Sequence, residues 1–177
     1  MLCGVKKIYI GIDPGAKGGI GIINGNRVQT IPYANQALLE VCQLFQGKAF
    51  VTVEKVHAMP GQGTVSMFTF GRNYGYILGV LEAFQMEYAT VEPRAWKKYF
   101  GVTSDKQTSI DRCKELYPGI NLLPTPRCKK ESDGMAESVM IARYGKENKD
   151  EKRFAELHLR RSASSVSQNG NSDSDVF

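Results

Sequence analysis

The sequence has few cysteines and histidines, and none of them forms a recognisable metal or disulfide motif. Cys3, Cys42, Cys113 and Cys128 form neither a CxxC pair nor a Cys/His pairing, which argues against a zinc site and a disulfide framework. Reduced thiols are the simplest account and are typical of the cytosol. No apolar run approaches the roughly 20 residues of a membrane span, and residues 1–7 lack a signal-peptide pattern. We therefore expect a cytoplasmic protein that has no membrane partner.

The last 32 residues of the chain carry no net charge, and the excess of basic residues lies entirely before them. The 177 residues carry 23 Lys and Arg against 18 Asp and Glu, a formal net charge of +5. Residues 1–145 hold 17 of the basic and 12 of the acidic residues, whereas residues 146–177 hold six of each. The basic part suits a polyanionic partner such as nucleic acid, although a solvated basic surface explains the charge equally.

Composition also divides the chain near residue 145. Residues 1–145 are long enough for one domain with a hydrophobic core. Beyond them a charged stretch reaches residue 161, and residues 162–177 are rich in Ser, Asn and Asp with little to bury. We expect residues 146–177 to form a tail that is partly disordered.

The apolar periodicity predicts an α/β order of elements. Three antiparallel strands are expected first, with Asn24-Gly25-Asn26 as the turn between the second and the third. Helices and strands then alternate, and shorter helices complete the domain. The expected strands cover residues 8–15, 17–23, 27–31, 49–54 and 86–91, and the expected helices cover residues 34–45, 65–84, 94–100, 104–117 and 133–144.

Local signals mark several of the expected helix ends. Ser104 and Gln107 match a capping box at the start of one helix. Ser132 is the expected N-cap of the last helix, and Gly145 is expected to terminate it.

Three glycines recur at every fourth position of the expected helix over residues 65–84. Gly71, Gly75 and Gly79 therefore line one face of that helix, and each costs about 1 kcal/mol relative to Ala. Such a face indicates close approach by another element. Two interpretations stay open, namely packing against the protein's own sheet and a helix crossing in a dimer.

Two of the expected strands carry an acid at the same kind of place. The first strand is apolar on both sides of Asp13, and a buried carboxylate is costly unless it is paired or bound to metal. The strand over residues 49–54 ends in Glu54. An ordinary turn through Asp13-Pro14-Gly15 is the alternative explanation of the first acid, but the repetition favours a shared acidic site.

Two more acids lie at the start of the last expected helix. Asp133 and Glu137 are four residues apart and therefore on one face, where their like charges repel mildly. A solvated helix N-terminus, which acids also suit, is the alternative. With Asp13 and Glu54 they form a set of hard oxygen ligands, which is typical of Mg²⁺ or Mn²⁺. Two such ions can activate a water and stabilise the leaving oxygen of a phosphodiester.

Four segments of the chain match the pattern of a known family in the right order. They are Ile10-Gly11-Ile12-Asp13-Pro14-Gly15, Val53-Glu54-Lys55-Val56, Glu92-Pro93-Arg94-Ala95-Trp96-Lys97 and Asp133-Gly134-Met135-Ala136-Glu137. These residues resemble the RuvC family of Holliday junction resolvases, within the ribonuclease H-like superfamily, and most of all its bacteriophage members. The resemblance covers about residues 5–145.

The resemblance implies an α/β, ribonuclease H-like fold, with a mixed five-stranded sheet of three antiparallel and then parallel strands, flanked by helices. It also implies a homodimer that resolves four-way DNA junctions by symmetric, Mg²⁺-dependent nicks and leaves 5′-phosphate ends that can be ligated. Such an enzyme acts in DNA recombination, DNA repair or phage DNA processing.

By position, the resemblance implies that Asp13, Glu54, Asp133 and Glu137 are catalytic and hold two Mg²⁺ ions, with Mn²⁺ as the alternative. Many family members have Asp where this chain has Glu137, with another Asp or a His about three residues before it. Here Asp133 is four residues before, and the longer arm of Glu changes the expected ligand geometry.

The same match suggests residues that contact DNA. Lys97 and Lys106 fall near positions where the family keeps basic residues close to the scissile phosphate, although both also fit an ordinary helix surface. His57 stands where relatives have an aromatic residue at the junction centre, and a planar ring can stack on an unpaired base. Further candidates for phosphate contacts are Arg72, Arg127, Lys129 and Lys130.

Two other functions fit the same residues. A related ribonuclease H-like nuclease would keep the metal ligands and act on other branched DNA or on RNA. A non-catalytic DNA-binding homologue would keep the fold without the reaction. Metal-dependent cleavage separates the binding protein from the nucleases, and the substrate separates the two nucleases from each other.

Overall fold

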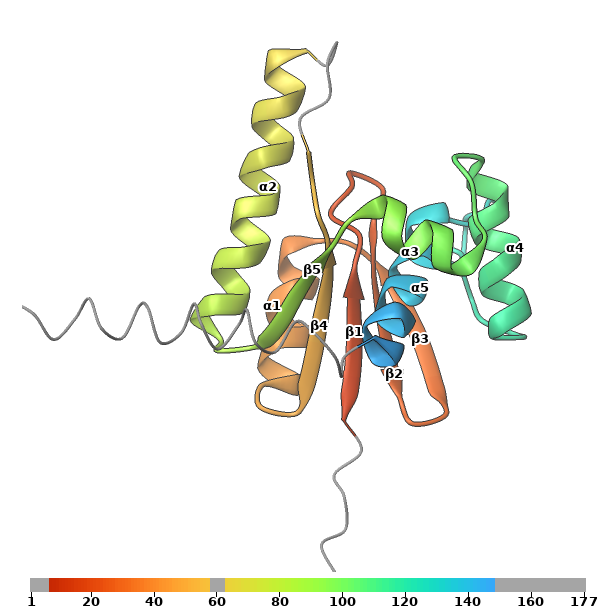
Figure 1. The fold of residues 1–177 in the computed structure, drawn as a ribbon, viewed down its shortest axis with the longest axis horizontal. Coiled ribbons are helices and arrows are strands. Elements are labelled where there is room, and N and C mark those ends of the chain that lie inside the picture. The colour runs from red at the N-terminus through yellow and green to blue at the C-terminus, as the bar shows by residue number, and fades with distance from the viewer. Residues whose placement is uncertain (1–6, 58–62, 149–177) are drawn as a thin grey trace, which may run out of the picture. The chain divides into compact units, whose positions relative to one another are not determined.

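The computed structural model describes residues 7–57 and 63–148. The chain divides into two units, Met1–Lys146 and Glu147–Phe177, and the predicted tail lies outside the described residues except for residues 146–148. Five strands form one sheet that has helices on both faces (Figure 1). The strands are β1 (Ile8–Ile12), β2 (Gly19–Asn24), β3 (Arg27–Pro32), β4 (Ala49–Glu54) and β5 (Glu87–Val91). The helices are α1 (Asn35–Phe45), α2 (Thr64–Ala83), α3 (Pro93–Phe100), α4 (Lys106–Leu116) and α5 (Asp133–Glu147).

The sheet is mixed, with the strand order β3-β2-β1-β4-β5. β1, β2 and β3 pair antiparallel, whereas β4 pairs parallel with both β1 and β5. Gly25 makes the turn between β2 and β3 with a φ of 60°, a conformation that favours glycine. The prediction of three antiparallel strands followed by parallel ones is confirmed.

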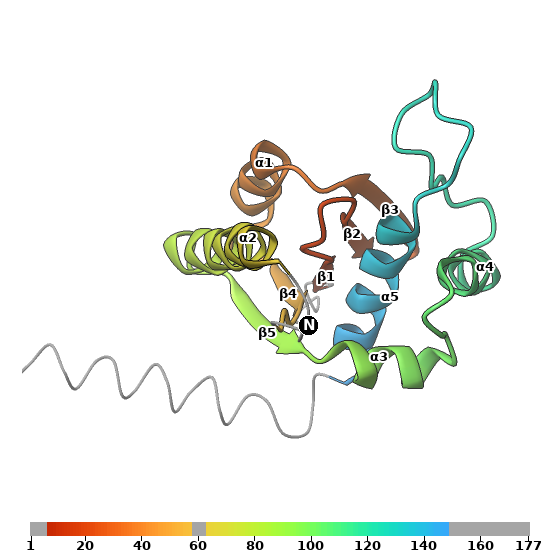
Figure 2. The ribbon, with the colours of Figure 1, turned by 90° about the horizontal axis from the view of Figure 1, so that it is seen from above.

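Different helices cover the two faces of the sheet (Figure 2). Ile8, Ile10 and Ile12 of β1 pack into the core that α1 and α2 complete on one face. Because side chains alternate along a strand, position 11, which is a glycine, and the Asp13 side chain face the opposite side of the sheet, which α5 covers. α3 and α4 bury apolar side chains against α5 on that side.

α5 lies directly on the backbone of β1 and β2 because the facing strand residues are glycines. A Cβ on Gly11 would overlap the backbone of Ser138 and Ala142. A Cβ on Gly21 of β2 would overlap the backbone at Ser138 as well. Such close approach fixes where the acids of α5 lie relative to the strand ends.

Two of the predicted helix ends are wrong. α5 continues beyond Gly145, which is buried where a Cβ would overlap the hydroxyl of Thr52 on β4. Close packing, and not a C-cap, therefore explains this glycine. α4 is capped by Asp105 instead of Ser104, because the Asp105 carboxylate accepts a hydrogen bond of 3.0 Å from the backbone N–H of Gln107.

α2 contacts the core mainly through its C-terminal half. Only three of its 20 residues, all between positions 77 and 81, are buried. Gly71, Gly75 and Gly79 face open space, since a Cβ on any of them would meet no other part of the described chain within 4 Å. Packing of this glycine face against the protein's own sheet is therefore wrong. Among the described residues, no helix is both long enough and apolar enough to cross a membrane, and this includes α2.

Candidate functional site

Asp13 and Glu54 lie side by side at the C-terminal ends of two neighbouring strands. β1 and β4 are parallel with Ile12 paired to Val53, so the residues that follow this pair are adjacent and on the same face of the sheet. Asp13 also begins a turn, because its Oδ1 accepts a hydrogen bond of 2.9 Å from the Gly15 N–H. One carboxylate thus shapes the turn and also faces the second acid.

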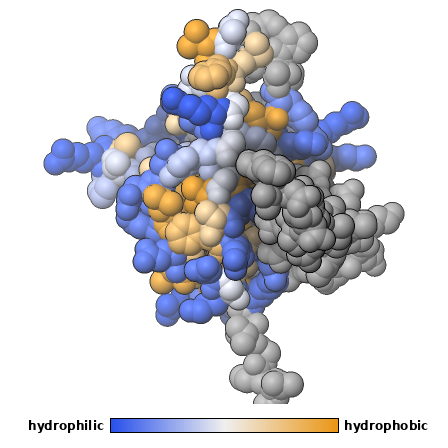
Figure 3. Space-filling view, turned by 90° about the vertical axis from the view of Figure 1, so that its left-hand side faces the viewer, coloured by the Kyte–Doolittle hydropathy of each residue, from blue (hydrophilic) through white to orange (hydrophobic). Residues whose placement is uncertain are grey.

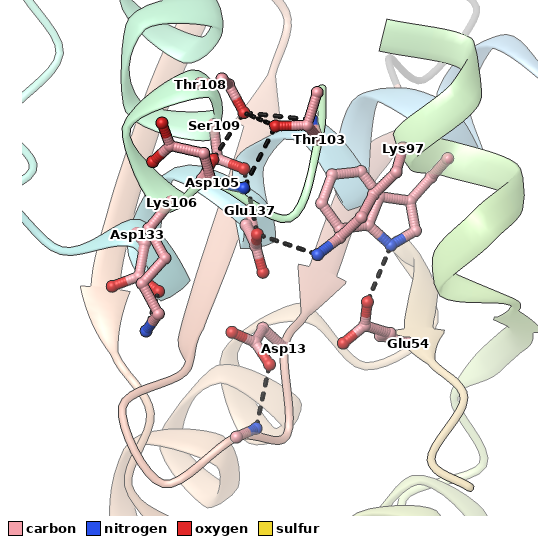
Figure 4. A network of polar contacts seen from close by, with 12 residues as sticks. Asp13, Glu54, Lys97, Thr103, Asp105, Lys106, Thr108, Ser109, Asp133 and Glu137 are labelled. Atoms are coloured by element: carbon pink, nitrogen blue, oxygen red, sulfur yellow. Dashed lines mark hydrogen bonds and ion pairs between the residues drawn. The ribbon is translucent and has the colours of Figure 1, made fainter. Parts of the chain in front are cut away.

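The first turn of α5 brings two further acids to this strand end. Ser132 caps the helix as predicted, and its Oγ accepts a hydrogen bond of 3.3 Å from the backbone N–H three residues on. Gly134 packs against the turn after β1, where a Cβ would overlap the backbone. Glu137 therefore points toward Asp13, with Asp133 beside them (Figure 4). We call the four carboxylates of Asp13, Glu54, Asp133 and Glu137 the acid site.

Burial and mutual repulsion make the acid site unfavourable in the absence of a cation. Asp13 is only 8% exposed, and its burial, followed by the nearby charge of Glu54, raises its pKa to about 7. Burial also raises the pKa of Glu54, although a hydrogen bond from Trp96 opposes that rise. A cation among these carboxylates would offset both effects.

Two lysines bring positive charge to the acid site. The Nζ of Lys97, on α3, lies 3.3 Å from Oε1 of Glu137, and the Nζ of Lys106, on α4, lies 2.7 Å from Oδ2 of Asp133. Both were singled out in the sequence as residues near the reacting phosphate. The Lys106 side chain is 70% exposed, and an ion pair this exposed contributes little stability. Lys106 can therefore leave Asp133 at little cost.

Two neutral donors that the sequence did not single out also contact the acid site. The indole N–H of Trp96 donates to Oε1 of Glu54 at 2.9 Å, and the hydroxyl of Ser109 donates to Oε1 of Glu137 at 3.0 Å. Both donors are fully buried. Trp96 belongs to a segment that resembles RuvC, which could have indicated a role, whereas no pattern in the sequence points to Ser109.

The residues of the acid site fit a divalent cation by their chemistry. All four supply carboxylate oxygens, the ligands that Mg²⁺ and Mn²⁺ prefer, and Asp13 is a buried acid among other acids. Within residues 7–57 and 63–148, no three His, Cys, Asp or Glu side chains are close enough together to hold an ion as they stand. Binding of an ion therefore requires a rearrangement of the acid site, in which Lys97 and Lys106 leave Glu137 and Asp133.

The other predicted DNA contacts lie on exposed segments of the described chain. His57 follows β4 and pairs with Glu92, which also holds Lys55 at 2.9 Å; hydrogen bonds from these two residues lower the pKa of Glu92. Arg72 is exposed on α2, and an exposed loop between α4 and α5 contains three basic residues, Arg127, Lys129 and Lys130. Among the described residues, none of the five forms a hydrogen bond or an ion pair with the acid site.

Comparison with solved structures identifies proteins of similar fold. Thermus thermophilus RuvC in complex with a Holliday junction substrate matches with a TM-score of 0.53 and 16% identity, over 77% of this chain and 90% of that chain. A structure of Thermus thermophilus RuvC matches with a TM-score of 0.50 and 16% identity, over 76% and 90% of the two chains. No family model and no curated protein matches the sequence. The chain thus has the α/β fold of RuvC, with a mixed five-stranded sheet flanked by helices, consistent with the ribonuclease H-like fold.

Proposed function

We propose that this chain is a crossover junction endodeoxyribonuclease, which resolves four-way DNA junctions by paired, metal-dependent nicks. The acid site is the observation that carries the proposal. β1, β4 and α5, three elements far apart in the sequence, bring four carboxylates together on a fold that resembles RuvC bound to a Holliday junction substrate. Carboxylates grouped in this way suit the metal-assisted hydrolysis of phosphodiesters.

The four acids would hold two Mg²⁺ ions, or Mn²⁺ in their place. Bound ions would activate a water and stabilise the leaving oxygen. The chain's own residues orient the reacting groups. Lys97 and Lys106 would face the scissile phosphate on release from Glu137 and Asp133, and the Gly15 N–H keeps the Asp13 carboxylate in place.

Exposed basic residues would bind the DNA backbone. Arg127, Lys129 and Lys130 are exposed in the loop that leads to Asp133, which favours phosphate contacts near the cleaved bond. Arg72 would contact phosphate from α2, and His57 would stack at the junction centre. Phosphate contacts made by these residues would release counterions, so the affinity for DNA should fall with rising salt.

We propose that the enzyme is a homodimer that assembles through α2. Among the described residues its glycine face, Gly71, Gly75 and Gly79, is open. On the same helix Val65 is 81% and Phe68 is 72% exposed, and the space-filling view of this side of the molecule shows hydrophobic residues at the surface (Figure 3). Burial of such apolar surface against a second copy would be favourable. A two-fold dimer would also supply the two acid sites that paired nicks require.

The remaining proposals rest on the sequence resemblance. Residues 1–145 would be the nuclease domain and residues 146–177 an appended tail. The enzyme would be of the bacteriophage type, and it would act in the cytoplasm of a bacterial host during recombination, repair or phage DNA processing.

Cleavage of a labelled four-way DNA junction with Mg²⁺ tests the proposal, beside a linear duplex, a flap and an RNA–DNA hybrid of the same sequence. Symmetric paired nicks confined to the junction are expected. Cutting of the other substrates at equal rates would favour the related nuclease of broader substrate range. Tight junction binding without any cutting would favour the non-catalytic homologue, with Glu137 as the first residue to change to Asp.

A further inference from the structure

α3 and α4 each place one lysine and one neutral donor against the acid site. In α3 these are Lys97 and Trp96, and in α4 they are Lys106 and Ser109. The lysine side chains are 30% and 70% exposed, respectively, whereas both neutral donors are fully buried. The lysines can therefore move when a ligand arrives, but the neutral donors cannot move without disturbing the core.

The Trp96 ring is fixed by the core around it. It belongs to a buried cluster with Val91, Phe100 and Met140, and rings in a close-packed interior keep one orientation on average. Its N–H is buried with the ring, and a buried donor without a partner is costly. Oε1 of Glu54 is that partner, so the packing of the ring also sets the orientation of the Glu54 carboxylate.

Ser109 is fixed in a similar way. It is fully buried, and its neighbour Ile110 packs with Met135 and Ala136 of α5 in a second cluster. Its hydroxyl therefore has a fixed position, from which it donates a hydrogen bond to Oε1 of Glu137. The packing of α4 on α5 thus sets the orientation of the Glu137 carboxylate.

Trp96 and Ser109 each bond to Oε1 of their carboxylate and leave its second oxygen available for a cation. Within the described residues, Trp96, Ser109 and Lys97 contact only Oε1 of Glu54 or Glu137. The other oxygen of each acid points toward Asp13 (Figure 4). A neutral donor on one oxygen orients a carboxylate without adding a charge that would repel a cation at the other.

We propose that Trp96 and Ser109 are positioning residues, whose hydrogen bonds hold Glu54 and Glu137 in the orientation that binds a divalent cation. The proposal rests on the metal-binding part of the proposed function. Glu54 would be oriented from α3 and Glu137 from α4. The proposal predicts that both hydrogen bonds persist when Lys97 and Lys106 move away.

Measurement of Mn²⁺ affinity by electron paramagnetic resonance on the full chain tests the proposal. Trp96→Phe and Ser109→Ala each remove one hydrogen bond, and each is expected to raise the Kd for Mn²⁺ about tenfold or more, the usual effect of losing an outer partner of a metal ligand. Ser109→Thr keeps the hydroxyl and should restore much of the affinity.

Two control variants separate positioning from general damage to the core. Ser138→Ala removes another buried hydroxyl, which bonds to the Met135 carbonyl at 2.8 Å and to Thr30 at 3.0 Å, and Phe100→Leu removes volume from the Trp96 cluster. Both controls should lower the unfolding midpoint and leave the Mn²⁺ Kd within about twofold of wild type. A rise in Kd that is no larger in the test variants than in these controls would overturn the proposal.

Fluorescence gives a readout that needs no change at position 96. Trp96 is the single tryptophan of the chain, and a paramagnetic ion quenches an indole within a few ångströms. Mn²⁺ should quench the emission with the same midpoint as the resonance titration, and Asp13→Asn should abolish the quenching. Bound Mn²⁺ without any change in emission would contradict a cation held by Glu54 beside the indole.

The outcomes for the two proposals are distinguishable. A chain that binds Mn²⁺ as described but cuts no junction would overturn the nuclease function and support the positioning role. A chain that cuts junctions while both test variants keep wild-type Mn²⁺ affinity would overturn the positioning role alone. Absence of Mn²⁺ binding by the wild-type chain would overturn both.

Discussion

α5 and α2 both carry glycines, but the two helices meet the sheet in different ways. Nine of the 15 residues of α5 are buried, and glycines on this helix and on the strands let the two backbones approach closely. Only three of the 20 residues of α2 are buried, and no other part of the chain that the structure describes lies within 4 Å of a Cβ on its glycines. The glycines at α5 thus allow close packing within the domain, whereas those of α2 form a face that packs against no described part of it.

The difference assigns separate roles to the two helices. Close approach of α5 delivers Asp133 and Glu137 to the strand ends, so a change there should alter the fold or the acid site. Among the described residues the glycine face of α2 takes no part in the core, so under the proposed assembly through α2 a change there should alter only contact with a second copy. Each prediction tests one side of this comparison.

The largest effect is expected when a glycine beneath α5 is enlarged. Gly11→Val should destabilise the fold by more than about 3 kcal/mol, because the added carbons would overlap the helix backbone, which cannot rotate away. Urea unfolding measures this change. Gly79→Val is the matched control and, at a protein concentration where the chain is monomeric, should alter stability by less than about 1 kcal/mol; equal losses in the two variants would remove the contrast between the helices.

Loss of the buried acid is expected to stop the reaction and leave the fold intact. Asp13→Asn should slow junction cleavage by at least roughly 100-fold, more than the loss of an outer partner of a metal ligand usually costs. Junction binding should persist or tighten, since a negative charge near the phosphates is removed. Gel-shift and cleavage assays measure the two effects, and weak binding by this variant would instead make Asp13 a structural residue.

The raised pKa of Asp13 predicts a pH dependence of stability in the absence of metal. Its pKa is raised from 3.8 to about 7 in the folded chain, so the native state binds this proton more tightly than the unfolded state. Its contribution to stability is therefore complete below about pH 4 and is lost as the pH rises through about 7. From pH 5 to pH 8 the loss should be roughly 2.5 kcal/mol.

Asp13→Asn isolates this contribution from that of the other acids. Urea unfolding in EDTA should show the variant gaining stability relative to wild type between pH 5 and pH 8, and Mg²⁺ should reduce the difference. Parallel pH profiles for the two proteins would show that Asp13 is not a buried acid of raised pKa.

A smaller effect is expected from a bulky residue on the α2 face. Gly75→Leu should weaken the dimer about tenfold, which is 1.4 kcal/mol, because the side chain would hold the partner helix away. Stability of the single domain should change little, since no part of the described chain lies within 4 Å of that position. Analytical ultracentrifugation measures the dimer Kd, with Gly75→Ala as the mild control, and a monomeric wild-type chain would refute assembly through α2.

Much of the fold and part of the acid site could be predicted from local pattern. β4 was predicted with its observed bounds. Asp13 and Glu54 could be assigned to one acidic site because each comes at the end of an apolar run. Their adjacency depends on the parallel pairing of β1 with β4. Asp133 and Glu137 could be placed on one face of a helix because helical spacing is local.

Features that depend on tertiary contact could not be predicted. Gly145 resembles a helix end in the sequence, but Thr52 of β4 decides its role. The direction of the α2 glycine face depends on which part of the helix meets the sheet. Trp96 and Ser109 contact acids 42 and 28 residues away in the sequence, and no local pattern encodes such pairings.

One experiment tests the acid site and the α2 interface together. Dimers of one wild-type and one Asp13→Asn protomer, isolated through two different affinity tags, would be mixed with a supercoiled plasmid that extrudes a four-way junction. We expect wild-type dimers to linearise the plasmid through paired nicks and the mixed dimers to produce only nicked circles, because each protomer carries one acid site. Linear product from the mixed dimers at the wild-type rate, or no cutting by the wild-type dimers, would contradict the account.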